Sequence, residues 1–207
     1  MQGRYRNRDD ILPDFTGMIC ASIKRDIVNV NEEDVMLSIA LFPCSYTDSA
    51  RMVGELSAFL KLRVYTDAML MSELSERSGV DLKRLEKQLF GTGLGSNRMT
   101  LEKELLLNMV KGIVVEQLAR EASRSLLYGF HASFFQNIDG IMNVLVHDEV
   151  ESRIARAQAQ EHCSRRQAER LVRDFDKRVH HWSVVLHSED LYDFSLYDVS
   201  VSLENMN

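Results

Sequence analysis

The sequence is poor in cysteine and has no long apolar run. Its three cysteines, Cys20, Cys44 and Cys163, are odd in number and lack the spacing of metal ligands. This set predicts reduced thiols in a cytoplasmic protein and no disulfide framework. No apolar run approaches the roughly 18 residues of a membrane-spanning helix, and MQGRYRNRDD has no signal-peptide pattern. We therefore expect no membrane partner.

An excess of positive charge is also absent. The chain has 25 basic and 31 acidic residues, a formal net charge of −6, which gives no general attraction to nucleic acid. Six histidines are present, but the adjacent His180 and His181 would point in different directions on a helix. Without convergent cysteine or acidic ligands, they predict no metal site.

Glycine and lysine are missing from the stretch that carries the clearest functional signal, residues 36–60. Residues 36–42 are almost all apolar, as in a buried parallel strand, and Pro43 ends the run. Apolar residues then recur at helical spacing from Met52 to Leu60. A loop between such a strand and helix is where phosphate binds, because the first N–H groups of the helix face it. Here the loop reads CSYTDS.

Short apolar runs alternate with amphipathic helices along the rest of the chain. We predict one sheet that contains residues 36–42, 126–130, 142–148 and 197–203, with a further short strand at 62–67. Helices are predicted at 69–79, 81–90, 100–123 and 149–162, with a last one opened by a capping box of Ser164 and Gln167. The fold class is therefore α/β, a three-layer sandwich with a mainly parallel sheet.

Two segments of the middle of the chain need separate interpretation. GTGLGSNR, residues 91–98, has three glycines but follows a lysine-rich helix, so we interpret it as a connecting loop and not a phosphate loop. The apolar helix 100–123 is expected to be central, with one face formed by Leu105, Met109, Ile113 and Leu118.

The N-terminal 35 residues are predicted to be a separate addition. Residues 1–10 form a polar arm, and apolar residues from Phe15 to Ile27 follow at helical spacing. An exposed apolar stripe of that size would be a liability. We expect this helix to bind a second subunit or another protein, or to cover the sheet.

The C-terminal half carries a resemblance to a known family. Arg153 and Arg156 follow the strand VLVHD, and Asp176-Lys177-Arg178 precede His181-Trp182. Tyr197-Asp198 come just before the last strand, and VYTDAMLMSELSERSGVD adds a weaker likeness further upstream. Over most of residues 36–205 this order resembles the cytidylate-kinase-like family of P-loop nucleoside monophosphate kinases. The resemblance implies a domain at 36–207, a helical lid at about 150–190, and ATP with magnesium as cofactors.

The resemblance also implies where a nucleotide would bind. The candidates are Cys44, Ser45, Thr47, Ser49, Arg51, Asp67, Arg153, Arg156, Arg173 and Arg178. Two simpler interpretations stand beside this one. The lid arginines alternate with acids such as Glu169 and Asp174, which suits a solvated, ion-paired helix face. Cys44 is a candidate reactive thiol, or else a small buried apolar residue.

The chain departs from the family where phosphate would bind. The family's glycine-rich, basic loop is replaced by PCSYTDSAR, which places Asp48 at the phosphate position. Two like charges 4 Å apart repel by about 4 kcal/mol at an effective dielectric constant near 20. A Gly-Arg-Gly-Ala turn of the family becomes Gly129-Phe130-His131-Ala132, so an arginine that binds the monophosphate is replaced by Phe130.

Three functions follow from these patterns. The first is a catalytically impaired member of the family that acts as a nucleotide-binding or regulatory module. The second is an active CMP-type kinase with an unusual loop, in which catalysis rests on positioning and on the lid arginines. The third is a structural interaction protein that binds no nucleotide.

Overall fold

The structure is a computed structural model, and it describes residues 38–90, 101–120, 125–136, 138–186 and 190–202. The predicted arm, the N-terminal helix and the loop 91–98 lie outside these residues.

Five parallel strands form one sheet, which confirms the α/β prediction. The strands are β1 (Ser38–Pro43), β2 (Arg63–Thr66), β3 (Ser125–Tyr128), β4 (Ile141–His147) and β5 (Val199–Ser202). Their order is β2-β3-β1-β4-β5, and every pairing is parallel. β1 is central because its inner residues are apolar on both faces: Ile39, Ala40, Leu41 and Phe42 are all buried. All four segments predicted to share a sheet contribute to it.

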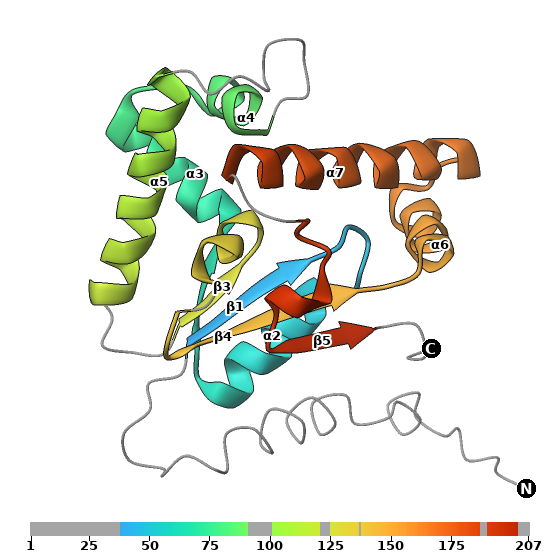
Figure 1. The fold of residues 1–207 in the computed structure, drawn as a ribbon. Helices are drawn as coiled ribbons and strands as arrows, with labels where there is room; N and C mark the ends of the chain where they lie inside the picture. The colour runs from blue at the N-terminus through green and yellow to red at the C-terminus, as the bar shows by residue number, and fades with distance from the viewer. Residues whose placement is uncertain (1–37, 91–100, 121–124, 137, 187–189, 203–207) are drawn as a thin grey trace, which may run out of the picture. The chain divides into compact units, whose positions relative to one another are not determined.

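The helices follow the predicted order. They are α2 (Ser49–Leu60), α3 (Asp67–Ser78), α4 (Leu82–Phe90), α5 (Leu101–Arg120), α6 (Val150–Glu161) and α7 (Arg165–Leu186). Two short 3₁₀ helices, η2 (Phe130–Phe135) and η3 (Phe194–Leu196), complete the described elements. The capping box is present, because the Ser164 N–H donates to Gln167 Oε1 at 2.9 Å. α2 lies on one face of the sheet, and α3, α5 and α7 lie on the other (Figure 1).

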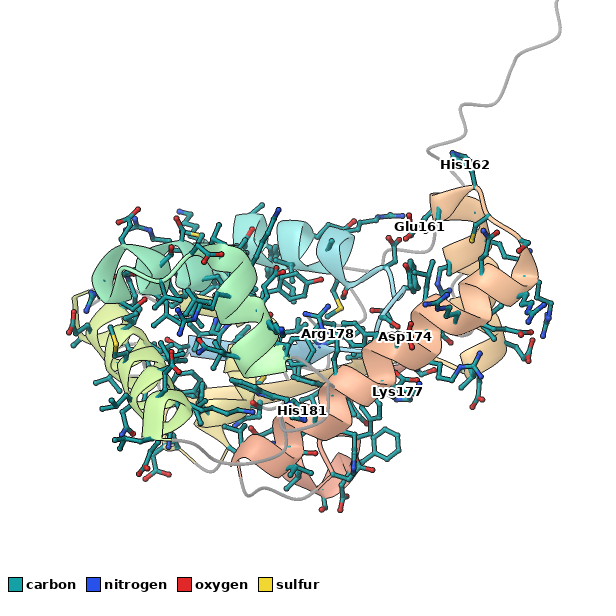
Figure 2. The ribbon with its side chains drawn as sticks, turned by 90° about the horizontal axis from the view of Figure 1, so that it is seen from above. Glu161, His162, Asp174, Lys177, Arg178 and His181 are labelled. Carbon is teal, nitrogen blue, oxygen red and sulfur yellow. The ribbon has the colours of Figure 1, made fainter. Side chains whose placement is uncertain are left out.

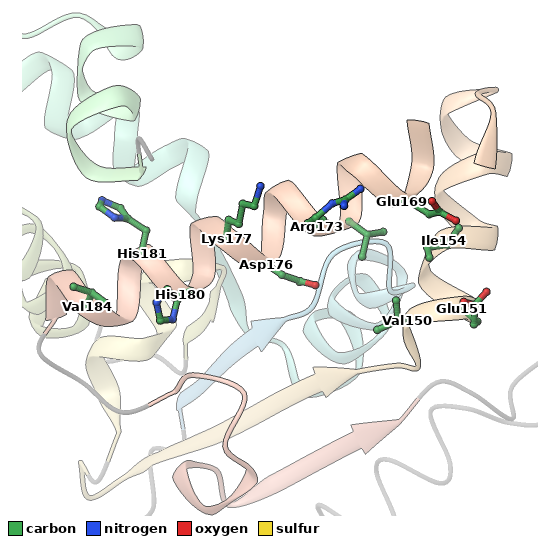
Figure 3. A pocket seen from close by; sticks show the side chains of 11 residues that line it. Val150, Glu151, Ile154, Glu169, Arg173, Asp176, Lys177, His180, His181 and Val184 are labelled. Atoms are coloured by element: carbon green, nitrogen blue, oxygen red, sulfur yellow. The ribbon is translucent and has the colours of Figure 1, made fainter. Parts of the chain in front are cut away.

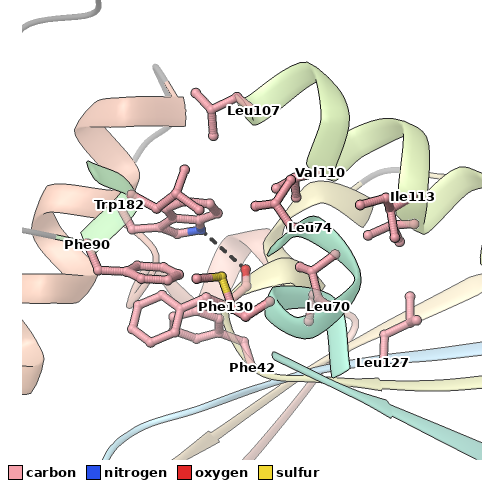
Figure 4. Packing of buried hydrophobic residues seen from close by; sticks show 14 of the residues in the cluster. Phe42, Leu70, Leu74, Phe90, Leu107, Val110, Ile113, Leu127, Phe130 and Trp182 are labelled. Atoms are coloured by element: carbon pink, nitrogen blue, oxygen red, sulfur yellow. Dashed lines mark hydrogen bonds between the residues drawn. The ribbon is translucent and has the colours of Figure 1, made fainter. Parts of the chain in front are cut away.

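The main core lies between the sheet and α3, α4, α5 and α7. Trp182 of α7 is its largest fully buried side chain, and its Nε1–H donates to Phe130 O at 3.2 Å (Figure 4). Phe130 stands between Phe42 and Phe90, with ring centroids 5.7 and 5.0 Å away. The strand predicted at 126–130 ends at Tyr128. Phe130 instead begins the 3₁₀ helix η2, and its aromatic side chain lies in the core.

The prediction for the buried face of α5 was right for Ile113 and wrong for Leu105. Ile113 is buried, and the half-buried Met109 and Leu118 pack against the core, whereas Leu105 is 57% exposed. The rest of the buried face consists of Leu106, Leu107, Val110 and Val114. α5 is also not central but lies at one side of the domain, beside α3 (Figure 1). The misassignment arose because α5 is apolar on more than one side, so periodicity could not select the inner face. Within the described residues, no helix is long and apolar enough to span a membrane.

We expect substitutions at a buried and at an exposed residue of α3 to differ strongly in their effect on stability. Leu74 is fully buried, whereas Met69 on the same helix is 44% exposed. Leu74→Ala should lower the free energy of unfolding by about 2–5 kcal/mol, because it removes buried methyl groups and leaves a cavity. Met69→Ala, the control, should change it by less than about 1 kcal/mol. Urea denaturation followed by circular dichroism measures both, and equal effects would contradict the assigned core.

Candidate functional site

The loop between β1 and α2 closes on itself without glycine. The Cys44 N–H donates to Val146 O of β4 at 2.8 Å, which holds the start of the loop against the sheet. Thr47 Oγ1 donates to Cys44 O, also at 2.8 Å. Tyr46 adopts a left-handed backbone conformation with φ of 54°, a region that favours glycine. The loop thus keeps a conformation suited to glycine while it carries ordinary side chains.

Arg153 of α6 reaches into this loop and is only 3% exposed. Its Nε donates to Ser45 O at 3.0 Å, and its Nη2 donates to Ser45 Oγ at 2.7 Å. The same Nη2 lies 2.6 Å from Asp176 Oδ1 of α7. One guanidinium therefore joins the loop, α6 and α7. Because arginine stays charged at any accessible pH, burial requires these acceptors.

A second set of contacts joins the loop to the same two helices through Tyr46. Arg156 of α6 donates from Nε to Tyr46 O at 2.8 Å and forms an ion pair with Asp148. The Tyr46 side chain packs against a small apolar cluster of α6 and α7: Ile154, Ala157, Ala168 and Val172. Its hydroxyl lies 3.4 Å from Glu161 Oε1, at the end of α6 (Figure 2).

Asp176 and Cys44 adjoin the Arg153 contacts; Cys44 is buried, and the Asp176 side chain is a third exposed. Tyr192 donates its hydroxyl hydrogen to Asp176 Oδ1 at 2.8 Å, so this carboxylate is held from two sides. Burial raises the pKa of the Cys44 thiol to about 11 and raises the pKa of Tyr192 as well. At neutral pH Cys44 is therefore a protonated thiol, which agrees with the buried apolar interpretation.

Asp67, the first residue of α3 and the residue that follows β2, organises the turn after β3. It accepts hydrogen bonds from the N–H groups of Phe130 at 2.8 Å and His131 at 3.2 Å. His131 Nδ1 lies 2.6 Å from Asp67 Oδ1. Gly129 has φ of 129°, and a Cβ built there would lie 2.1 Å from Asp67 Oδ2. The glycine is required because the carboxylate occupies the space of a side chain.

Hydroxyl groups gather between Asp67 and the loop. Ser49, the first residue of α2, has its Oγ 2.9 Å from the hydroxyl of Tyr128 at the end of β3. Thr47 Oγ1 lies 3.1 Å from the same Ser49 Oγ. Burial raises the pKa of Tyr128, so its phenol stays protonated. These groups sit at the carboxyl ends of parallel strands, where α/β folds bind their ligands.

The other three predicted arginines lie away from the loop contacts. Arg51 pairs with Glu55 on the exposed side of α2 at 2.9 Å. Arg173 is exposed on α7 and lines a groove with acidic and basic neighbours (Figure 3). Arg178 projects from α7 toward the core (Figure 2), with its guanidinium 5.3 Å from the centroid of Phe90 and 5.7 Å from that of Phe130.

The ion-paired interpretation of the lid holds for some arginines and not for others. Arg165 pairs with Glu151 and Glu169, and Arg170 pairs with Asp174, all on exposed surfaces. Arg153 and Arg156 instead turn inward to the loop. The arginines that face the loop are more buried than those in the surface ion pairs, and sequence spacing does not report burial.

Three residues of the site were not predicted as site residues: Tyr46, Asp176 and Tyr192. Asp176 belongs to the motif that carries the family resemblance, but neither it nor Tyr192 was among the predicted nucleotide-binding residues. The sequence offered one signal for these contacts: Tyr46 is a large aromatic residue in a short polar loop, which indicates that its side chain packs against another part of the chain. Within the parts of the chain that the structure describes, no cluster of His, Cys, Asp and Glu could hold a metal ion.

A match to the phosphate-loop pattern G-x-x-x-x-G-K-[ST] can be tested on this geometry. If Ser49 is taken as the hydroxyl residue that follows the lysine, Asp48 stands at the lysine position and Thr47 at the glycine position. Asp48 is exposed and caps α2 without a side-chain hydrogen bond. The charge at this position is therefore reversed.

Comparisons with known proteins agree on the fold. A model of the cytidylate kinase-like family matches residues 46–205. An uncharacterized protein from Eubacterium ventriosum has a TM-score of 0.62 at 10% identity, over 83% of this chain and 91% of that chain. Shikimate kinase from Bacteroides thetaiotaomicron has a TM-score of 0.46 at 12% identity, over 80% and 85%. At such identities the first likeness shows a shared fold alone, and the second is too weak to support an argument. No curated protein matches the sequence.

The contacts of Arg153 predict a large stability effect. Arg153→Met should lower the free energy of unfolding by about 3 kcal/mol, the lower end of the range for breaking a buried ion pair, because Asp176 is a third exposed. Arg165→Met is the control: its two ion pairs are exposed, so the change should stay below about 1 kcal/mol. Urea denaturation measures both. If the two variants are equally stable, Arg153 does not join the loop to the lid.

The turn after β3 provides a separate test. Gly129→Ala should destabilise the fold by about 1–3 kcal/mol, since it adds a Cβ at positive φ and displaces Asp67. Gly54→Ala, in the middle of α2 with open space around the new Cβ, should instead stabilise it by about 0.5–1 kcal/mol. Thermal unfolding distinguishes these opposite signs. A neutral Gly129→Ala would mean that Asp67 does not anchor the turn.

Proposed function

The chain belongs to the cytidylate kinase-like family, and we propose that it is a member that no longer transfers phosphate. It acts as a regulatory module that binds nucleotide weakly at most. The single observation that carries this proposal is the burial of Arg153 between Ser45 and Asp176.

Arg153 is placed to hold the loop and not a phosphate. In kinases, cationic groups stabilise the charge on the transferring phosphoryl group. Here the guanidinium donates to a backbone carbonyl, a hydroxyl and a carboxylate of its own chain. To reach a nucleotide it would have to leave all three, and Asp176 would lose a partner. Loss of such charged contacts costs roughly 1.5–3 kcal/mol each.

The loop itself favours cations over anions. It turns the carbonyls of Ser45 and Tyr46 toward guanidinium groups. Asp48 stands where a phosphate loop has lysine, and a like charge 4 Å away would repel by about 4 kcal/mol at a dielectric constant near 20. The residues present therefore do not fit a magnesium nucleotide in this arrangement.

The second phosphate site of the family is also altered. Phe130 replaces its arginine and is buried among aromatic rings. Arg178 stacks on this ring instead of pairing with an anion. The replacement of the arginine by Phe130 reduces the positive charge at the carboxyl edge of the sheet, which supports a regulatory role over catalysis. A cytoplasmic location stays a prediction from the reduced thiols.

The alternative is an active CMP-type kinase, and two features favour it. Ser49 keeps a hydroxyl at the start of α2, and Asp67 keeps a carboxylate directly after β2. Such an enzyme would require α6 to withdraw Arg153 from the loop during turnover. A purely structural protein, the third possibility, would bind no nucleotide even after the loop is repaired.

We expect the full-length chain with millimolar ATP, magnesium and CMP to form no CDP above the enzyme-free blank, measured by anion-exchange chromatography. ATP with magnesium should shift its melting temperature by less than about 1 °C. The variant Thr47→Gly/Asp48→Lys should gain a shift of several degrees, because a ligand at about 100 times its Kd stabilises a fold by roughly 2.7 kcal/mol. Asp139→Lys, the same charge change at the opposite edge of the sheet, is the control and should gain none.

Each other outcome decides between the alternatives. CDP formation with turnover, lost in Arg153→Met while the fold persists, would establish the active kinase. If neither the natural chain nor the repaired loop responds to ATP, the structural protein is the better description. A shift in the Asp139→Lys control would show that charge alone, and not the loop, governs binding.

A further inference from the structure

α5 carries a second apolar stripe on the face that its own core does not use. Leu101, Leu105 and Val115 are 75%, 57% and 61% exposed. With three further exposed residues they recur at alternating steps of four and three, and we call these six the outer seam: Leu101, Leu105, Asn108, Gly112, Val115 and Ala119. This spacing is that of a helix that packs along a partner helix. α5 lies at the side of the domain (Figure 1).

Side chains are on the whole larger in the first half of the outer seam than in the second. Leu101, Leu105 and Asn108 occupy the first half of α5, and Gly112, Val115 and Ala119 occupy the second half, where Val115 is the largest. A Cβ at Gly112 would meet nothing within 4 Å, so the seam is open at its middle. A partner helix with the opposite gradient would fill it.

We propose that this partner is α5 of a second copy, packed antiparallel about a two-fold axis near the middle of the helix. That arrangement sets Leu101 against the partner's Ala119 and Leu105 against the partner's Val115. Asn108 then lies against the partner's Gly112. Every layer pairs a larger residue with a smaller one, as close packing requires. A parallel arrangement would set leucine against leucine and glycine against glycine, which leaves a gap at the centre.

Charges beside the outer seam fit the same arrangement. Along one flank, Glu102 pairs with Arg84 of α4 at 2.8 Å, and Glu116 pairs with Arg77 of α3 at 2.9 Å. The antiparallel arrangement brings the Glu102–Arg84 pair of one copy beside the Glu116–Arg77 pair of the other. Glu102 then faces the partner's Glu116, and each of these carboxylates keeps its own arginine, Arg84 or Arg77, as counter-ion, so the flank carries no net excess of charge.

The other flank presents no strong conflict. Lys111 would approach the partner's Lys111 near the axis, but its Nζ lies 5.8 Å from the centroid of Phe134 in its own copy. Glu104 lies across from the partner's Leu118, which is half-buried. The 20 residues of α5 span about 30 Å, so one pair of these helices buries less surface than a stable protein–protein interface usually does. We therefore expect a dimer with a dissociation constant in the micromolar range, about 10⁻⁶–10⁻⁵ M.

The test compares three versions of the full-length chain by sedimentation equilibrium from about 1 to 200 μM. The natural chain should be in monomer–dimer equilibrium. Leu105→Glu should raise the dissociation constant at least about tenfold, because it sets a carboxylate against an apolar partner. The double variant Leu105→Glu/Val115→Lys should restore the dimer, since the antiparallel arrangement then sets opposite charges together. Leu171→Glu, at an exposed leucine of α7, is the matched control and should leave the dimer unchanged.

Each remaining result overturns the proposal. A dimer that survives Leu105→Glu uses another surface, and a double variant that stays monomeric rejects the antiparallel arrangement. A natural chain that is monomeric at every concentration, with a melting temperature lowered by Leu105→Glu, would show that another segment of the same chain covers the outer seam. Circular dichroism spectra confirm that each variant is folded. None of these results depends on whether the loop binds nucleotide.

Discussion

The arrangement of the candidate site depends on one buried guanidinium. Arginine cannot lose its charge to escape burial, so Arg153 must keep acceptors around it wherever it lies. Ser45 provides a carbonyl and a hydroxyl, and Asp176 provides a carboxylate that Tyr192 holds in place. The loop after β1 and helices α6 and α7 are therefore joined through one side chain.

This junction reverses the polarity of a phosphate site. A phosphate loop directs N–H groups and a lysine toward an anion. Here carbonyls of the loop accept hydrogen bonds from Arg153 and Arg156, and the lysine position holds Asp48. The loop has become a site for cationic side chains of its own lid. Tyr46 strengthens the junction because its side chain packs against residues of both α6 and α7.

The fold was predictable to a greater extent than the site. Apolar runs marked β1, β3 and β4, since these parallel strands are buried on both faces and their pattern is local, and alternation marked β5. Phe130 was assigned to a strand because its apolar character fits a strand and a core 3₁₀ helix equally. Leu105 was wrongly assigned to the buried face of α5 because leucines occur on several sides of this helix. The inward turn of Arg153 depends on Ser45 and Asp176, which are distant in sequence, so no local pattern could report it.

A crystal structure of the full-length chain grown with millimolar ATP and magnesium tests this account most directly. The account predicts that the Arg153 guanidinium stays within hydrogen-bonding distance of Ser45 and Asp176, with no phosphate density over residues 44–51. Phosphate density on that loop, with Arg153 turned toward it and away from Asp176, would contradict the account.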